Sequence, residues 1–308
     1  MSYESKMLKK LKMPIRNEVE EALLIALFKH NGVIKEFGSS EEIVAEIADD
    51  FGLNEEQRSA YLKTIYRKEN RVKKSSLWHR LLFRAADALA KEKYVSRPTQ
   101  TLKLMNKREW MLTESGFDKA LALLNIPASK KEFLPTKSYE VQKIVKKLHE
   151  TKRPKDYNPF DKKKKVVKVS KETTLRTRGF RQAIIEAYDC KCSVCGLKIY
   201  SPDTLSWEVE AAHIVPHRAN GKDDIWNGIA LCHLHHWAFD VGWFTLLNNY
   251  TVQISSREDS LPSDFGKVGN YELLKSIYND SRISLPGRKE IYPHKNAMNW
   301  HRENIFHQ

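Results

Sequence analysis

The sequence lacks the features of a secreted or membrane-spanning protein. None of its apolar runs approaches the roughly 18 residues that a spanning helix needs, and its N-terminus carries no signal-peptide h-region. Cysteine is scarce as well: the chain has four, and the first 189 residues contain none. A secreted disulfide framework would spread its cysteines along the chain. We therefore expect a soluble, cytoplasmic protein with no membrane partner.

Acidic residues are also few in comparison with basic ones. The formal net charge is +14. From Lys130 to Arg181 there are 18 Lys and Arg against six Asp and Glu, so a net charge of +12 lies in 52 residues. A run such as Lys162 to Lys165 is typical of a solvated linker. An excess of this size, however, usually serves a polyanionic partner such as nucleic acid.

The length of 308 residues is about twice that of a typical domain, which predicts two domains joined by a linker. The pairs Ile126-Pro127, Arg153-Pro154 and Asn158-Pro159 interrupt the middle of the chain. This stretch is otherwise basic and contains one expected amphipathic helix at about residues 138 to 149. We place an N-terminal domain at residues 1–126, a basic helical segment and linker at 127–172, and a C-terminal domain at 173–308.

The N-terminal domain is expected to be mostly helical. Apolar residues recur at helical spacing from Val19 to Phe28 and stop at Gly32. Residues typical of helix N-caps precede the later helices, whereas two short strand-like runs are joined by a basic, polar stretch. The expected caps are Ser39 or Ser40, Asn54, Ser75 or Ser76, and Thr113, and the expected strands are 93–95 and 109–112.

Helices followed by a hairpin and a last helix are the order of a winged helix-turn-helix domain. Three motifs, Asn70-Arg71-Val72, Leu77-Trp78 and Leu112-Thr113-Glu114-Ser115-Gly116, resemble the N-terminal winged-helix domain of Mrr-type restriction proteins. The resemblance implies double-stranded DNA as a partner, although winged helices also mediate protein contacts. It leaves open whether the domain reads an unmodified or a methylated base. The candidate DNA contacts here are Trp78, His79, Arg80, Arg84, Lys103 and Lys107.

Two pairs of metal-ligand residues stand in the C-terminal domain. Cys192-x2-Cys195 is followed, after 36 residues, by Cys232-x2-His235. Two such pairs can complete one tetrahedral Cys3His zinc site. In a chain without a secretion signal, clustered cysteines beside histidines are more often metal ligands than disulfides. Cys190 is left over, because Cys192 has the short spacing to Cys195 that a zinc knuckle needs.

A second set of polar residues lies between and beside these pairs. His213 ends an alternating, strand-like run, Asn227 stands five residues before Cys232, and His236 directly follows His235. The motifs His213-Ile214-Val215-Pro216, Asn227-Gly228 and Leu231-Cys232, with the His235-His236 pair, resemble the HNH nuclease family. Phe180-Arg181, Phe239-Asp240 and Trp300-His301-Arg302-Glu303 resemble the branch of this family found in many bacterial restriction enzymes. The resemblance covers about residues 175–308.

The HNH resemblance implies an α+β protein whose C-terminal domain is a zinc-stabilised ββα-metal domain. It assigns the general base to His213 and one catalytic Mg²⁺ or Mn²⁺ to His236, while Asn227 orients the base or holds the turn. The chemistry fits, because phosphodiester hydrolysis needs a base for water and a cation for the developing charge. Histidine titrates near neutral pH and suits the first task. The zinc would be structural.

One position departs from the family pattern. Many HNH enzymes carry Asp or His directly before the general base as a second metal ligand, but Ala212 stands there. Asp240, four residues after His236, would project from the same helix face and is our first candidate for this ligand. His217 and Asn227 follow. An inactive site is the alternative.

Together these features predict a site-selective DNA endonuclease of the restriction type. Arg176, Arg178 and Arg181, just before the zinc knuckle, are candidate phosphate contacts. A single HNH site cuts one strand, so double-strand cleavage needs a homodimer or two successive nicks. Two alternatives stay open: a DNA-binding regulator with an inactive zinc module, and a non-specific nuclease toxin whose N-terminal domain holds an inhibitor protein.

Overall fold

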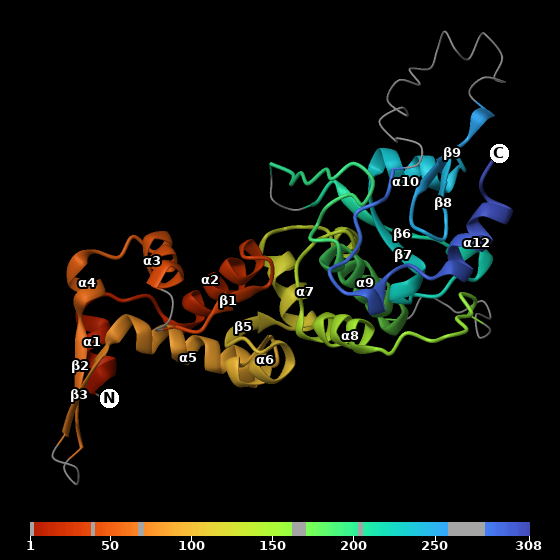
Figure 1. Cartoon of the computed structure of the whole chain (residues 1–308). Coiled ribbons are helices and arrows are strands. Elements are labelled where there is room, and N and C mark those ends of the chain that lie inside the picture. Colours follow the sequence, from red (N-terminus) through yellow and green to blue (C-terminus); the bar gives the residue numbers. More distant parts are fainter. Residues whose placement is uncertain (1–2, 38–40, 67–70, 162–170, 203–205, 258–280) are drawn as a thin grey trace. The chain divides into compact units, whose positions relative to one another are not determined.

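The computed structural model describes residues 3–37, 41–66, 71–161, 171–202, 206–257 and 281–308. The chain mixes helices and strands, which confirms the α+β prediction, and it divides into two compact units, Met1–Gln142 and Lys143–Gln308 (Figure 1). None of the helices in the described ranges is long and apolar enough to cross a membrane. The predicted cap residues Ser39 and Ser40 and the lysine run 162–165 lie outside the described residues.

The first unit is a helical body with a small sheet and a separate hairpin (Figure 1). The sheet is antiparallel with the strand order β1-β5-β4, and β2 pairs with β3. The elements are α1 (Tyr3–Lys10), α2 (Arg16–Lys29), β1 (Val33–Lys35), α3 (Glu41–Asp50), α4 (Glu55–Ser59), β2 (Tyr61–Tyr66), β3 (Arg71–Ser76), α5 (Leu77–Lys91), β4 (Val95–Ser96), α6 (Pro98–Met105), β5 (Glu109–Leu112), α7 (Glu114–Leu123) and the 3₁₀ helix η2 (Ala128–Glu132).

Side-chain caps begin three of these helices as the sequence predicts. The Ser76 hydroxyl accepts a hydrogen bond from the amide of His79, and Thr113 accepts one from that of Gly116. Asn54 and Gln57 cap α4 reciprocally. Such caps satisfy backbone N–H groups that have no partner inside the helix. The apolar stripe of α5 then packs on α2, where both helices are buried.

One expectation for the first unit is corrected, and one of its elements was not predicted. The stretch between the strands β4 and β5 is not irregular but contains α6, which starts with Pro98 and ends at Asn106 in the left-handed conformation. Proline is well suited to the first turn of a helix, where its missing N–H costs nothing. The hairpin of β2 and β3 was not predicted, because the mixed basic and polar sequence of residues 61–76 shows no clear alternation.

The second unit is built around a strand pair enclosed by helices (Figure 1). Its elements are α9 (Lys171–Ala187), β6 (Val209–His213), the 3₁₀ helices η3 (His217–Ala219) and η4 (Ile225–Asn227), β7 (Gly228–Cys232), α10 (His233–Asp240), β8 (Phe244–Leu246), β9 (Val252–Ile254), η7 (Lys289–Ile291) and α12 (Lys295–Asn304). Helix α8 (Tyr139–Glu150) contains the boundary between the two units. Strands β8 and β9 pair as an antiparallel hairpin.

Strands β6 and β7 pair in antiparallel register, with Val209 opposite Cys232 and His213 opposite Gly228. Helix α9 packs on this pair, and α10 follows β7 directly. Gly228 is needed for the packing, because a Cβ there would lie 2.4 Å from Ile184 and 2.8 Å from Phe180. The resulting ββα unit of β6, β7 and α10 carries the residues that the sequence singled out.

Candidate functional site

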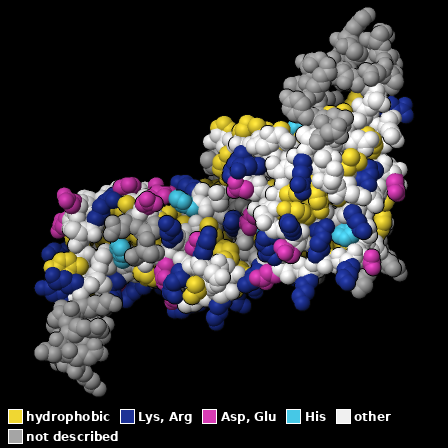
Figure 2. Space-filling view, in the orientation of Figure 1, with side chains coloured by type: hydrophobic (Ala, Val, Ile, Leu, Met, Phe, Trp, Pro, Cys, Tyr) yellow, Lys and Arg dark blue, Asp and Glu magenta, His cyan; other side chains and the backbone are white. Residues whose placement is uncertain are grey.

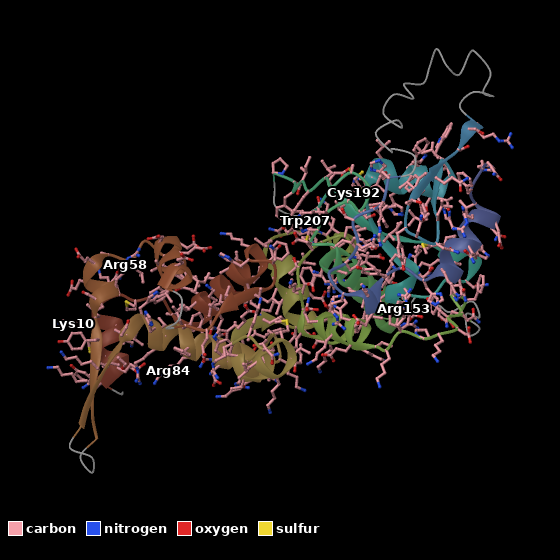
Figure 3. All side chains as sticks on the ribbon, viewed as in Figure 1. Lys10, Arg58, Arg84, Arg153, Cys192 and Trp207 are labelled. Carbon is pink, nitrogen blue, oxygen red and sulfur yellow. The ribbon has the colours of Figure 1, made fainter. Side chains whose placement is uncertain are left out.

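Cys192, Cys195, Cys232 and His235 come together as the sequence predicts (Cys192 is labelled in Figure 3). The Nδ1 atom of His235 lies 3.5 Å from the Cys192 sulfur and 3.0 Å from that of Cys232. The sulfurs of Cys195 and Cys232 are 3.9 Å apart. A tetrahedral zinc ion with typical Zn–S and Zn–N bonds holds its ligand atoms roughly 3.5–3.8 Å apart. The three measured separations lie within about 0.5 Å of this range, so the cluster can hold a metal ion such as zinc.

Local backbone structure presents these four ligands. The knuckle is closed by hydrogen bonds from Gly196 N to Cys192 O and from Cys192 N to Leu197 O, both 2.9 Å long. Gly196 has φ +74°, a conformation that favours glycine. Cys232 ends β7 and is the N-cap of α10, so His235 falls in the first helical turn. Cys190 lies outside the cluster.

The electrostatics of the cluster favour a thiolate at Cys192 only, because burial raises the pKa of Cys195 and the hydrogen bond to Cys192 raises that of Cys232. The hydrogen bond from Cys232, together with that from His235, lowers the pKa of Cys192 although burial opposes this. Thiolate is the form of cysteine that binds metals.

His213 lies at the end of β6 and is held on two sides. Its ring stacks on the buried Phe180, with centroids 4.1 Å apart and planes 20° apart. Its Nε2 atom is 3.1 Å from Oδ1 of Asp223, and Nε2 of His217 lies 3.1 Å from the same oxygen. Burial acts to raise the pKa of Asp223, but the hydrogen bonds from His213 and His217 outweigh it and hold that pKa well below its usual range. Asp223 is thus a buried anion between two imidazoles.

His236 lies on α10 between two carboxylates. Its Nδ1 atom is 3.0 Å from Oε2 of Glu210, and its Nε2 atom is 3.6 Å from Oδ2 of Asp240. The hydrogen bond from His236 lowers the pKa of Glu210 to about 2. Burial acts to lower the pKa of His236, but Glu210 and Asp240 reverse this and raise it, whereas burial raises the pKa of Asp240.

The carboxylates around His236 are candidates to replace the metal ligand that is missing at Ala212. The Ala212 side chain is buried and offers no donor atom. Glu210 lies two residues earlier, on the same face of β6, and Asp240 lies on α10 where the sequence placed it. Carboxylate oxygens suit Mg²⁺ or Mn²⁺, whereas imidazole nitrogen is a donor for transition metals. His236 therefore has a carboxylate on each side, whereas the ligand atoms that lie within 4.8 Å of one another near this site, among the described residues, are those of His213, His217 and Asp223.

Asn227 holds the loop that follows β6 by side-chain hydrogen bonds. Its side chain accepts a hydrogen bond of 2.8 Å from Val215 N and donates bonds of 3.0 Å to Val215 O and Lys222 O. Gly221 lies inside this turn, where a Cβ would collide with Val215 O. Asn227 is fully buried. Its observed contacts are those of a residue that holds the turn, one of the two roles that the family pattern leaves open.

The comparison with known proteins agrees with this arrangement. Residues 192–247 match the model of a protein family described as HNH endonuclease. The site lies in an HNH endonuclease domain. Among solved structures, a modification-dependent TagI restriction endonuclease is similar at 18% identity with a TM-score of 0.28. The similarity covers 41% of this chain, which spans 37% of that enzyme. No curated protein matches the sequence.

Two of the candidate DNA contacts are corrected. Trp78 is 2% exposed and donates its indole N–H to the carbonyl of Val44, so it presents no surface to DNA. Arg178 is 5% exposed, so little of its side chain is available to a phosphate. Residues 176–181 are part of α9, and Arg178 falls on the buried side of this helix.

The other candidates reach the surface to different extents. His79 and Arg80 are partly exposed on α5, and Arg84 is exposed (labelled in Figure 3). Arg181 is partly buried, and its charge acts on Glu210 and His236. On the face shown in Figure 2, Lys and Arg side chains are spread over both units rather than gathered in one patch. Lys103, Lys107 and Arg176 are exposed.

The sequence did not single out Glu210 or Asp223. Glu210 could have been found from strand alternation, because it shares a face with Ala212. Asp223 has no comparable signal, since it lies in an irregular loop ten residues after His213. Only the folded loop brings it to the histidine.

Proposed function

We propose that this protein is a site-selective, restriction-type DNA endonuclease that hydrolyses phosphodiester bonds with a histidine general base and one divalent metal ion. The observation that carries the proposal is that His213 on β6 and His236 on α10 both lie inside the HNH match, and that a carboxylate holds each imidazole. Phosphodiester hydrolysis needs a general base and a cation, and these two histidines of one ββα unit are our candidates for the base and for the cation ligand.

Each side chain has a distinct task in this proposal. His213 accepts a proton from the attacking water. His236 and Asp240 would hold Mg²⁺ or Mn²⁺, which supplies positive charge for the phosphorane and the departing oxygen. Asn227 keeps the loop after β6 in place. The Cys3His cluster would bind a structural zinc ion that fastens the knuckle to the start of α10.

We further propose that residues 1–126 form a winged helix-turn-helix domain that selects the DNA site. The sheet order β1-β5-β4, with α2 before β1 and with α3 and α5 between β1 and β4, supports this topology. Helix α6 then occupies the place of the wing. Helix α5 would be the recognition helix, with His79, Arg80 and Arg84 toward DNA, and Lys103, Lys107, Arg176 and Arg181 would contact phosphates. Residues 127–172 would link this domain to the nuclease domain at 173–308.

Plasmid digestion by the purified protein tests the proposal. Methylated and unmethylated plasmid are incubated with Mn²⁺ or Mg²⁺, with and without chelator, using the wild type and His213→Ala. His30→Ala, which removes a surface histidine from the first unit, is the matched control. We expect discrete fragments from the wild type and the control, and none from His213→Ala, which still binds DNA in a gel shift. Equal cleavage by His213→Ala contradicts the proposal.

The same digestion separates the alternatives. Ala212 favours a DNA-binding regulator with an inactive site, for which binding without any cleavage is the expected result. A smear instead of fragments points to a non-specific nuclease. Accumulation of nicked circles before linear DNA indicates two successive cuts, whereas direct formation of linear DNA indicates a homodimer.

A further inference from the structure

Asp223 is a buried acidic residue that the proposed chemistry has not yet used. Its side chain is 8% exposed. A carboxylate in such a place is unfavourable unless hydrogen bonds satisfy it. One oxygen, Oδ1, lies 3.1 Å from Nε2 of both His213 and His217, whose rings are 4.2 Å apart. The fold thus keeps a buried anion whose described contacts are imidazole nitrogens, one of them on the proposed general base.

The contact decides which nitrogen of His213 carries the proton. An ionised carboxylate only accepts hydrogen bonds, so the ring nitrogen that faces it must carry a hydrogen. In the neutral ring, hydrogen on Nε2 puts the lone pair on Nδ1. A general base needs that lone pair, because it is what takes the proton from water.

Phe180 supplies a second constraint on the same ring. Its aromatic face lies 4.1 Å from the His213 ring and is inclined by only 20°. Phe180 is 1% exposed and fixed in the core between α9 and the strand pair. Stacking sets the plane of the imidazole, and a hydrogen bond to Asp223 sets its rotation within that plane.

We propose that Asp223 is the positioning residue of the general base: it holds His213 in the tautomer with hydrogen on Nε2 and turns the Nδ1 lone pair toward the attacking water. This inference rests on the nuclease function proposed above. Asp223 itself does not touch the reacting atoms. His217 shares the carboxylate from the more exposed side, since 43% of its side chain is accessible.

The side chains of His213, His217 and Asp223 could also form a cation site. All three carry metal-ligand atoms, and these atoms lie within 4.8 Å of one another. An ion bound there would take the Nε2 lone pair of His213 and put hydrogen on Nδ1. The two arrangements therefore predict opposite tautomers for the wild-type ring, which makes them separable by experiment.

The chain provides a matched control in the next residue. Asp224 is also largely buried, but its Oδ2 accepts a hydrogen bond of 3.3 Å from the hydroxyl of Tyr157 instead of facing an imidazole. Asp223→Asn and Asp224→Asn make the same chemical change at neighbouring positions. Only the first replaces the acceptor of His213 by an amide, whose N–H₂ can donate to the ring and favour the wrong tautomer.

The kinetic experiment compares these two variants with the wild type in Mn²⁺-dependent nicking of plasmid. For Asp223→Asn we expect kcat to fall by about 10²-fold or more, the usual scale of general-base catalysis, with KM and gel-shift Kd within about threefold. Asp224→Asn should keep kcat within about threefold. A fall in kcat equal for both variants, or none for Asp223→Asn, overturns the proposal.

The spectroscopic experiment needs no nuclease activity. Long-range ¹H–¹⁵N correlation spectra of the ¹⁵N-labelled wild type, assigned with His213→Ala, report the tautomer of the His213 ring. We expect hydrogen on Nε2, and loss of this state in Asp223→Asn but not in Asp224→Asn. Hydrogen on Nδ1 in the wild type overturns the proposal even where plasmid cleavage confirms the nuclease.

Calorimetric titration of Mn²⁺ without DNA tests the cation-site arrangement. Asp223→Asn should bind Mn²⁺ within about threefold of the wild-type affinity, whereas His236→Ala should lose it. If Asp223→Asn and His213→Ala lose Mn²⁺ binding and His236→Ala retains it, Asp223 is a metal ligand and the positioning role is wrong.

Discussion

Glu210 on β6 and His236 on α10 are joined by a contact of 3.0 Å between Oε2 and Nδ1, which links the strand to the helix across the proposed active site. The contact leaves Nε2 of His236 on the side of Asp240, 3.6 Å from that carboxylate. A carboxylate behind a metal-binding histidine commonly fixes its tautomer and orientation. We therefore expect Glu210 to orient His236, a role that the sequence alone did not reveal.

Replacing Glu210 should weaken the catalytic metal site without emptying the zinc site. We expect Glu210→Gln to lower the affinity for Mn²⁺ by about 10- to 100-fold, the usual effect of losing such a partner. Calorimetric titration of Mn²⁺ measures this. Glu208→Gln is the control, because Glu208 faces His233 instead of His236. Unchanged Mn²⁺ affinity in Glu210→Gln would show that the carboxylate has no part in metal binding.

Removal of one zinc ligand should destabilise the second unit. We expect the purified wild type to contain one zinc ion per chain and Cys232→Ser to contain none, with a fall in Tm of about 10 °C or more. Zinc analysis and thermal unfolding followed by near-UV circular dichroism check this. Cys190→Ser is the matched control, since Cys190 lies outside the cluster, and it should keep its zinc and its Tm. Loss of zinc from Cys190→Ser would mean that the ligand set is different.

Glu4 on α1 should restrain DNA binding by α5. Its carboxylate is 2.8 Å from Arg84 and 3.0 Å from Arg80, and it is itself largely buried. If α5 contacts DNA, Glu4 competes with phosphate for both guanidinium groups. We expect Glu4→Gln to tighten DNA binding by about three- to tenfold at low salt and to steepen its salt dependence.

Fluorescence anisotropy with a duplex over a range of salt concentrations measures the effect of Glu4→Gln. Asp49→Asn is the control, because it breaks a similar ion pair to Arg58, on α4. Equal Kd values for Glu4→Gln and the wild type would remove the support for α5 as the recognition helix.

The sequence predicted the Cys3His cluster of the second unit because scarce residues mark it. Cysteine and histidine at short spacings are uncommon in a core, so the spacing alone is enough to pair Cys192-x2-Cys195 with Cys232-x2-His235. The site around His236 was predicted less completely. Its partner Glu210 belongs to a short strand, and only the packing of that strand on α10 brings the two side chains together.

The first unit shows the other limit of sequence-based inference. Helices begun by Ser76 and Thr113 were predicted, because a cap is a local interaction. The burial of Trp78 was not, because it depends on a hydrogen bond to Val44, 34 residues away in the chain. Arg178 was misplaced for the same reason: which side of α9 becomes buried is decided by the strand pair that packs on it.

His301 should make the stability of the second unit depend on pH. Its ring is 2% exposed, stacks on Phe239 with centroids 3.7 Å apart, and contacts the Thr245 hydroxyl. Burial lowers the pKa of His301 to about 4. Between this value and the ordinary pKa of about 6.5, the unfolded chain binds a proton that the folded chain does not, so stability decreases as the pH falls through this window. The contribution lost between pH 7 and pH 5 is about 2 kcal/mol.

The His301 effect can be isolated as a difference between two proteins. Urea unfolding of the wild type and of His301→Gln at pH 7 and pH 5 gives the free energy of unfolding of each. His301→Gln should be less stable at pH 7, because the stacked ring is lost, yet it should lose about 2 kcal/mol less than the wild type on going to pH 5. His30→Gln, at an exposed histidine, should follow the wild type. An equal loss of unfolding free energy in the wild type and His301→Gln between pH 7 and pH 5 would contradict the prediction. It would mean that His301 takes up its proton in the folded state, which its enclosure between Phe239 and Thr245 opposes.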